Sequence, residues 1–165
     1  MVLVCLEGAK MMAKLYKALI VVGFLTLLSG CTTFNIKEIS IDLESDNYES
    51  VEIDFSQYST AIEWDTLYIV RPYSNVKEFQ FENWNLNQLD MMAQSDSEIL
   101  VLYSLKKRVV GYSLVPRRFD LLQLWGETKY QYDPYIKFDL KRSKFLFVKR
   151  DEVYKLVDIQ TDLAN

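Results

Sequence analysis

Apolar and polar residues alternate in short runs from about residue 39 to the C-terminus. A period of two is typical of a strand with one buried face, and a short unbroken apolar run is typical of a strand buried on both faces. These patterns predict strands at residues 39–43, 51–55, 67–70, 99–105, 109–115, 136–140, 145–147 and 153–157. The first strand is ambiguous, because residues 32–50 would also fit a loose tether. We favour the tether.

The breaks between the predicted strands occur at proline and at charged turns. Pro72 ends the strand at residues 67–70, because proline has no backbone N–H to donate to a neighbouring strand. Lys106, Lys107 and Arg108 separate two apolar runs of similar length. This arrangement predicts a β-hairpin, although the Asn-Gly pair that favours tight hairpin turns is missing.

Two segments carry weaker signals for helix. Asn75 and Glu78 have the spacing of a capping box, which predicts a short helix over residues 76–81. Residues 89–93 fit one further helical turn, and residues 119–125 fit either a helix or a strand. The chain as a whole therefore predicts an α+β fold, with a largely antiparallel sheet of five to seven strands and one or two short helices.

The first 31 residues follow a different pattern. Lys10, Lys14 and Lys17 precede the apolar run Ala18–Leu28. That run has the length of the hydrophobic region of a signal peptide and is too short to span a bilayer, which needs roughly 20 apolar residues. It ends in Leu28-Ser29-Gly30-Cys31. This ending resembles the lipobox of bacterial lipoproteins, in which a branched apolar residue and two small residues precede an obligatory cysteine.

The resemblance implies that Cys31 is a membrane anchor. In the family, a diacylglyceryl group is transferred to the cysteine thiol, the chain is cleaved before the cysteine, and the new amino terminus is often acylated, commonly with palmitate. Two or three acyl chains give stable anchoring, whereas one gives marginal binding. Thr32 stands where an aspartate would favour retention at the inner membrane. The resemblance therefore implies a lipid-anchored cell-envelope protein, facing the periplasm from the outer membrane if the cell is Gram-negative.

This interpretation divides the chain into three parts. Residues 1–30 are the signal peptide, within which residues 1–11 fit an over-extended start, because a methionine near residue 11 would be a more usual beginning. Residues 31–50 form the lipidated tether, unless they include a first strand. Residues 51–165 form a single globular domain, since their number suits one hydrophobic core.

Charge and cysteine content restrict the partners of the mature chain. The full chain has 19 basic and 23 acidic residues, and removal of residues 1–30 takes away three lysines and Glu7. The remaining 16 basic and 22 acidic residues give a net charge of −6. Such a charge argues against nucleic acid and against generic binding to anionic lipid. With Cys31 acylated no thiol remains, so we expect no intramolecular disulfide.

The residues needed for the commonest catalytic and cofactor chemistries are missing. Histidine is absent from the whole chain, which removes Ser-His-Asp catalysis and most transition-metal sites. Gly111 and Gly126 are the two glycines after the signal, so there is no glycine-rich phosphate loop. We therefore expect no cofactor, no metal and no enzyme activity. A carboxylate-based hydrolase of envelope glycans, with Glu63 and Asp65 as its pair, is a less favoured alternative.

One local block has a distinctive composition. Residues 64–73 follow the pattern W-D-x-L-Y-x-x-x-P-Y, which resembles a block in small, uncharacterised exported bacterial proteins and implies no known activity. We favour a structural role, in which Trp64 covers the core edge, Asp65 fixes the start of the strand and Tyr73 packs at the turn. The alternative is a ligand patch formed by Trp64, Asp65, Tyr68 and Tyr73, because aromatic faces beside a carboxylate suit sugars or basic side chains.

Basic residues gather at four places, namely 106–108, 117–118, 141–142 and 149–150. All four fall at predicted turns or strand ends, where charge keeps sheet edges soluble. The alternative is that they converge on one face and bind a phosphate-rich envelope polymer.

These observations favour one function and leave two open. The favoured function is a lipid-anchored module that binds or assembles with an envelope protein. A periplasmic inhibitor or immunity lipoprotein that neutralises a foreign enzyme is the first alternative, because a negative charge suits a basic target. The glycan hydrolase is the second.

Overall fold

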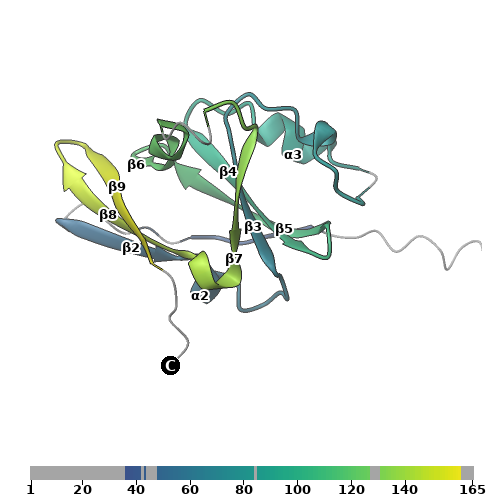
Figure 1. Cartoon of the computed structure of the whole chain (residues 1–165), viewed down its shortest axis with the longest axis horizontal. Helices are drawn as coiled ribbons and strands as arrows, with labels where there is room; N and C mark the ends of the chain where they lie inside the picture. The colour runs from purple at the N-terminus through teal and green to yellow at the C-terminus, as the bar shows by residue number, and fades with distance from the viewer. Residues whose placement is uncertain (1–35, 42, 44–47, 84, 127–130, 161–165) are drawn as a thin grey trace, which may run out of the picture. The chain divides into compact units, whose positions relative to one another are not determined.

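The computed structural model describes residues 36–41, 43, 48–83, 85–126 and 131–160. The predicted signal peptide and Cys31 lie outside these residues. The described residues belong to one compact unit, Asn35–Asn165. They form nine strands arranged in two sheets, a larger sheet of five strands and a smaller sheet of four (Figure 1).

The larger sheet contains the β4–β5 hairpin at its centre. Its strand order is β1-β5-β4-β3-β7, and neighbours run antiparallel except for β1, which is parallel to β5. The strands are β1 (Lys37–Glu38), β3 (Thr66–Val70), β4 (Glu98–Leu105), β5 (Arg108–Pro116) and β7 (Tyr135–Asp139). The predicted hairpin is confirmed, because β4 and β5 pair along their length and are joined by Lys106 and Lys107.

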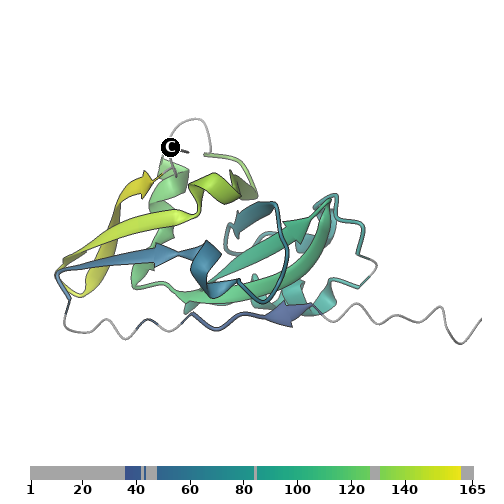
Figure 2. The ribbon, with the colours of Figure 1, turned by 90° about the horizontal axis from the view of Figure 1, so that it is seen from below.

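The smaller sheet is built mainly from the C-terminal part of the chain. Its order is β2-β8-β9-β6, and β6 runs parallel to β9. The strands are β2 (Ser50–Asp54), β6 (Phe119–Asp120), β8 (Lys144–Arg150) and β9 (Val153–Gln160). Figures 1 and 2 show β2, β8 and β9 side by side, although β2 is separated from the other two by most of the domain's sequence.

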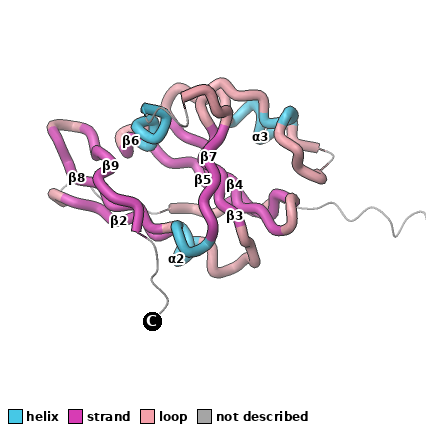
Figure 3. The backbone as a smooth tube through the Cα atoms, viewed as in Figure 1, coloured by secondary structure: helices cyan, strands magenta, loops and turns pink. Residues whose placement is uncertain are grey.

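Helices are short in the described part of the chain (Figure 3). They are α2 (Phe55–Tyr58) and α3 (Asn87–Met92), together with the 3₁₀ helices η1 (Val76–Glu78), η2 (Leu121–Gly126) and η4 (Leu140–Arg142). The fold is therefore mostly β with little helix, where the sequence predicts α+β, and the described residues form nine strands rather than five to seven. Its largely antiparallel character is as expected. The prediction of a single sheet was wrong, because alternation identifies a buried face but does not identify the sheet to which a strand belongs.

The two sheets share one hydrophobic core, called here the inner core. Leu67 and Ile69 of β3 lie in it together with Phe145 and Phe147 of β8, and all four side chains are fully buried. Phe138 of β7 meets Phe145 edge to face, with ring centroids 5.1 Å apart. This arrangement is favourable for aromatic pairs and joins the larger sheet to the smaller one.

A second cluster, called here the outer core, covers the opposite face of the larger sheet. Tyr68 and Val70 belong to it, because successive strand side chains point to opposite faces. Val76 of η1 and Leu89 of α3 pack over them. The Asp90 carboxylate accepts a 2.8 Å hydrogen bond from the Val76 N–H, which ties the two helices together.

The capping residue predicted for the first helix is present. The Asn75 side chain accepts a hydrogen bond from the Lys77 N–H and donates one to Glu78. The helix is shorter than the predicted residues 76–81, because Phe79 already has extended backbone angles.

Residues 36–41, assigned above to the tether, run along β5. The Ile39 N–H donates to the Tyr112 carbonyl at 2.8 Å, and the Ser113 hydroxyl donates to the Ile39 carbonyl at 2.7 Å. A Cβ built on Gly111 would lie 2.9 Å from Ile39 Cδ1 and 2.8 Å from Ile62 Cδ1. The absence of a side chain at Gly111 therefore lets β1 approach β5. The folded part of the chain thus includes residues on the N-terminal side of position 51.

Candidate functional site

Trp64, the first residue of the 64–73 block, is part of the inner core. Its side chain is 8% exposed and meets the Tyr103 ring edge to face at 5.4 Å. Its indole N–H donates to the Ser59 hydroxyl. A buried indole with a satisfied N–H stabilises the fold and presents little surface to a ligand.

Asp65 holds the β4–β5 turn. One carboxylate oxygen accepts a 3.0 Å hydrogen bond from the Lys106 N–H, and the other accepts from the Thr66 hydroxyl at 2.8 Å. Its own N–H donates to the Ser104 carbonyl. Asp65 therefore fixes the backbone of a turn 41 residues away in the sequence.

Tyr68 lies in the outer core, with its ring edge to face with Phe81 at 5.0 Å and Tyr135 at 5.2 Å. Trp64 and Tyr68 are therefore on opposite sides of the larger sheet. Asp65 and Tyr73 lie beyond opposite ends of β3. The structure thus does not bring the four side chains of the predicted patch together, because the block runs the length of one strand.

Tyr73 is the exposed aromatic residue of the four, with 60% of its surface accessible. Its hydroxyl donates to the Asp96 carboxylate, and the Arg117 guanidinium lies over its ring at 5.7 Å. Its N–H donates to the Ala93 carbonyl at 2.8 Å. Contacts from two further elements therefore hold the ring in one position at the surface.

The backbone at Tyr73 is unusual for a bulky residue. The Ser74 N–H donates to the Arg71 carbonyl, which closes a four-residue turn with Pro72 and Tyr73 at its centre. Proline at the second position and a φ of 65° at the third fit a type II turn, in which glycine is the favoured third residue. A tyrosine there costs about 1 kcal/mol, and such strain is found preferentially at functional sites.

Tyr132 extends the same surface and is 86% exposed. Its neighbours are held to the Tyr73 turn, since the Gln131 carbonyl accepts from the Arg71 guanidinium at 2.8 Å. The Pro134 carbonyl accepts from the Arg71 N–H and from the Ser74 hydroxyl. We call the group that these contacts connect the tyrosine surface. It consists of Arg71, Tyr73, Asp96 and Arg117, together with the exposed Tyr132 that follows Gln131 in the chain.

A pocket adjoins the tyrosine surface at the start of β7. It is lined by residues 133–137. Pro134 both lines the pocket and accepts hydrogen bonds of the Tyr73 turn, so the pocket and the turn share this residue. The tyrosine surface offers exposed tyrosine rings beside arginine, and these residue types are enriched at protein–protein interfaces.

Of the five members of the tyrosine surface, the sequence predicts only Tyr73 as a site residue and misses Arg71, Asp96, Arg117 and Tyr132. Arg117 was assigned to a basic pair at a strand end. A signal for Tyr73 did exist, since a turn that begins with Arg71-Pro72 and continues without glycine is unusual. No sequence signal joined it to Asp96 or Arg117.

The opposite end of the larger sheet carries a second strained turn, called here the lysine turn and made of Lys106 and Lys107. Their φ angles are 48° and 68°, which fit the type I′ hairpin turn that favours Asn-Gly. Lysine at both positions costs about 1 kcal/mol each. Both side chains are exposed, and among the described residues neither makes an ion pair within 4 Å.

The four basic clusters do not converge on one face. Residues 106–108 and 117–118 lie at opposite ends of β5, and residues 149–150 belong to the smaller sheet. Residues 141–142 follow β7, whose Asp139 pairs with Thr66 at the start of β3. Residues 141–142 therefore lie at the same end of the larger sheet as the lysine turn.

Glu63 and Asp65, the carboxylate pair considered above, lie just before strand β3 of the larger sheet. Glu63 is exposed and lies before the start of β3, and both Asp65 oxygens accept hydrogen bonds. No group of three or more His, Cys, Asp or Glu side chains that could hold a metal ion occurs in this part of the chain.

Within the described residues, no helix is both long enough and apolar enough to cross a membrane.

Comparison with protein-family models, with curated proteins and with solved structures found no match to this chain.

Proposed function

We propose that this chain is a lipid-anchored module of the cell envelope that binds another protein through the tyrosine surface. Leu28-Ser29-Gly30-Cys31 supports the anchor, with Cys31 carrying the lipid. The main support for binding is the conformation of Tyr73. This bulky residue occupies a left-handed turn position, and its exposed ring is held by Asp96 and Arg117. A rigid exposed tyrosine beside arginine loses little conformational entropy on binding and is typical of interface hot spots.

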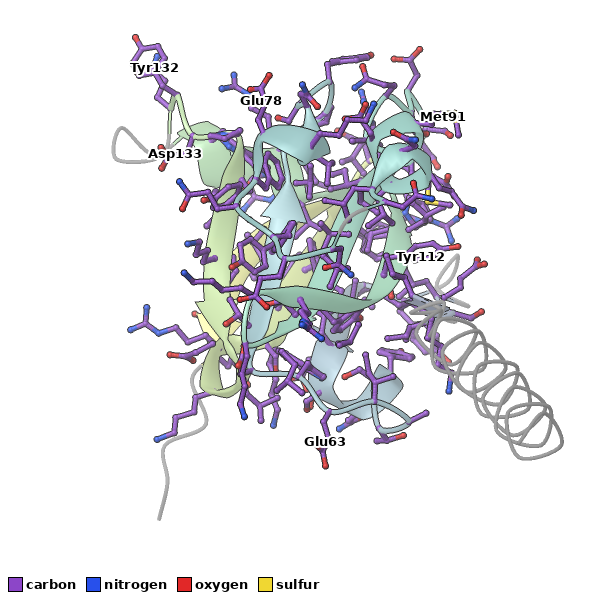
Figure 4. All side chains as sticks on the ribbon, turned by 90° about the vertical axis from the view of Figure 1, so that its right-hand side faces the viewer. Glu63, Glu78, Met91, Tyr112, Tyr132 and Asp133 are labelled. Atoms are coloured by element: carbon purple, nitrogen blue, oxygen red, sulfur yellow. The ribbon has the colours of Figure 1, made fainter. Side chains whose placement is uncertain are left out.

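The tyrosine surface occupies one end of the larger sheet, away from the start of β1. Because β1 is parallel to β5, the chain enters β1 from the Arg108 side of the larger sheet. The tyrosine surface lies at the opposite side, where Arg117 follows the last residue of β5. Figure 4 shows Glu63 at one end of the domain and Tyr132 and Asp133 at the other.

The test is crosslinking in living cells with a C-terminally tagged chain, followed by mass spectrometry of the co-purified proteins. We expect one dominant envelope protein in near-equal amount, together with a lipid-modified Cys31 as the amino terminus. A Cys31→Ser variant should lose the lipid and the membrane association. A lipidated chain without any crosslinked protein would contradict the binding role. A foreign enzyme as the captured partner would favour the inhibitor or immunity alternative instead.

A further inference from the structure

We infer that the protein bound at the tyrosine surface adds an extended segment to β7 as a further antiparallel strand of the larger sheet, with an acidic side chain opposite Lys137. This inference rests on the proposed binding function and names the part of the partner that the domain recognises. It depends on the open side of β7, on the charges of Lys137 and Asp139, and on the end of the sheet at which β7 begins.

β7 is an edge strand of the larger sheet. Among the described strands it pairs with β3 alone. Figure 4 shows it on the outer side of the sheet, beginning near Asp133. Two of the other edge strands, β1 and β6, are only two residues long. Within the described part of the chain, β7 and β2 are therefore the edges with room for several backbone hydrogen bonds to a partner.

The backbone of β7 has hydrogen-bonding groups on its open side. The Arg71 N–H donates to the Pro134 carbonyl, which makes these residues a hydrogen-bonded pair of the antiparallel ladder. Such pairs occur at every second residue, so Ile136 bonds β3, whereas the N–H and C=O groups of Tyr135 and Lys137 point away from β3. No backbone hydrogen bond among the described residues uses these outward groups. An extended segment laid along this edge can pair with all of them.

A hollow lies beside the open edge. The pocket at the start of β7 is lined by residues 133–137, which are consecutive in the chain. The hollow therefore follows the strand and does not cross the sheet. The Tyr73 turn is bonded to the same stretch, because the Ser74 hydroxyl donates to the Pro134 carbonyl. A segment that pairs with β7 thus reaches the tyrosine surface at the end where β7 begins.

Lys137 stands in the middle of β7 with its ammonium held in place. Its Nζ lies 5.5 Å from the centre of the Tyr68 ring and 5.2 Å from the centre of the Tyr135 ring. The side chain is exposed and makes no ion pair within 4 Å among the described residues. The Cβ of a directly opposite residue on an added strand lies about 5 Å away on the same face. A carboxylate there pairs with the ammonium, whereas a lysine or arginine is repelled.

Asp139 extends the charge pattern to a second position. It is exposed and lies on the same face of β7 as Lys137. Because an antiparallel partner runs the opposite way, its residue opposite Asp139 precedes the acidic residue by two positions. The segment therefore has a basic residue, one residue of any kind and an acidic residue, and it continues toward the tyrosine surface. Charged residues on an edge also prevent chance pairing, so the same two side chains select the partner.

The experiment uses the full chain in living cells, with a photo-crosslinking amino acid at position 132. The crosslinked complex and the chain without a crosslink are purified, and mass spectrometry with fragmentation gives amide hydrogen exchange at single residues. We expect the Tyr135 and Lys137 N–H groups to exchange at least about tenfold more slowly in the complex, because they gain hydrogen bonds. The Ile136 N–H, which already bonds β3, should change little.

A matched pair of proline variants tests the open edge itself. Lys137→Pro removes an N–H that points away from β3, a position at which an edge strand tolerates proline. It should lower the crosslink yield from position 132 about tenfold. Glu52→Pro is the control on β2, where the N–H also points outward, because the Lys149 N–H donates to the Glu49 carbonyl. This variant should keep the yield, and urea unfolding verifies that both variants fold.

A charge reversal tests the pairing of Lys137 without removing its N–H. Lys137→Glu should lower the crosslink yield about fivefold, because two acidic side chains then face each other. The crosslinked peptide identifies the partner's segment, and lysine in place of its acidic residue should restore the yield. A segment without an acidic residue, or a loss that this exchange does not restore, would contradict the pairing.

The outcomes separate the strand addition from the proposed binding function. Unchanged exchange at Tyr135 and Lys137 in a crosslinked complex would overturn the strand addition and leave binding at the tyrosine surface in place. Equal losses of yield from Lys137→Pro and Glu52→Pro would do the same. A second copy of this chain as the crosslinked protein, or no crosslink to any protein, would contradict both.

Discussion

The two ends of the larger sheet carry turns with the same left-handed backbone conformation but different side chains. At one end, Tyr73 occupies a left-handed turn position and presents an aromatic ring beside charges of both signs. At the other, Lys106 and Lys107 occupy two left-handed positions and present ammonium groups. In each turn a residue with a bulky side chain stands where glycine or asparagine would be favoured.

The difference between the ends lies in what holds the exposed side chain. Asp96 and Arg117 fix the Tyr73 ring, which suits recognition of one particular partner. At the lysine turn, Asp65 holds the backbone through the Lys106 N–H, and both lysine side chains are exposed. The buried residues between the two ends show no such strain and serve the cores.

The largest expected change in stability separates two residues of the 64–73 block, the buried Trp64 and the exposed Tyr73. Trp64→Ala should destabilise the domain by about 3–5 kcal/mol, because it empties a site in the inner core. Tyr73→Ala should change the free energy of unfolding by less than about 1 kcal/mol, because the ring is exposed. Urea unfolding of both variants measures the two values. Similar losses from the two substitutions would show that Tyr73 is structural.

The next effect tests whether β1 belongs to the folded domain. Gly111→Ala should destabilise the domain by about 1–3 kcal/mol, because the new methyl group would crowd Ile39 and Ile62. Gly126→Ala is the matched control, since nothing lies within 4 Å of a Cβ at that position. Hydrogen exchange at the Ile39 N–H should accelerate in the first variant and remain slow in the second. Unchanged stability of both variants would mean that β1 contributes little.

A smaller loss of stability is expected at Asp65, which holds the backbone of the lysine turn. Asp65→Ala should destabilise the domain by about 1–2 kcal/mol, because the Lys106 N–H loses its acceptor. Asp65→Asn keeps one acceptor oxygen and should cost less. Thermal unfolding of the two variants gives the comparison. An Asp65→Asn variant as unstable as Asp65→Ala would indicate that charge, rather than the hydrogen bond, supports the turn.

The smallest expected effect is a gain in stability. Lys106→Asn combined with Lys107→Gly should stabilise the domain by about 1 kcal/mol, because the favoured type I′ residues relieve the steric cost. Urea unfolding of this double variant measures the gain, and Lys149→Gln combined with Arg150→Gln controls for the loss of two charges. A destabilised Asn-Gly variant would contradict the assignment of strain to the lysines.

Local features of this fold could be predicted from the sequence. The β4–β5 hairpin, the strand ended by Pro72 and the capping residue Asn75 each depend on neighbours in the chain, and all three are present. The division into two sheets depends on pairings such as β2 with β8, which are separated by most of the domain. Alternation within one strand carries no information about such a partner.

The candidate surface was found only in part for the same reason. Tyr73 was singled out because it ends an unusual block, whereas Asp96 and Arg117 reach it from the ends of β4 and β5. Trp64 and Tyr68 were grouped with it although β3 sends them to opposite faces. The bounds of β3 alone are enough to place Trp64 and Tyr68 on opposite faces of the sheet. The contacts of Tyr73 with Asp96 and Arg117 can be seen only in the tertiary structure.

The most direct test of the account places a photo-crosslinking amino acid at Tyr132 or at Tyr48 in living cells. Both tyrosines are exposed, by 86% and 62%, but Tyr48 lies beside the smaller sheet, where its carbonyl accepts from Tyr154. The account predicts a single strong crosslink to an envelope protein from position 132 and none from position 48. A crosslink from position 48 alone, or equal yields from both, would contradict binding through the tyrosine surface.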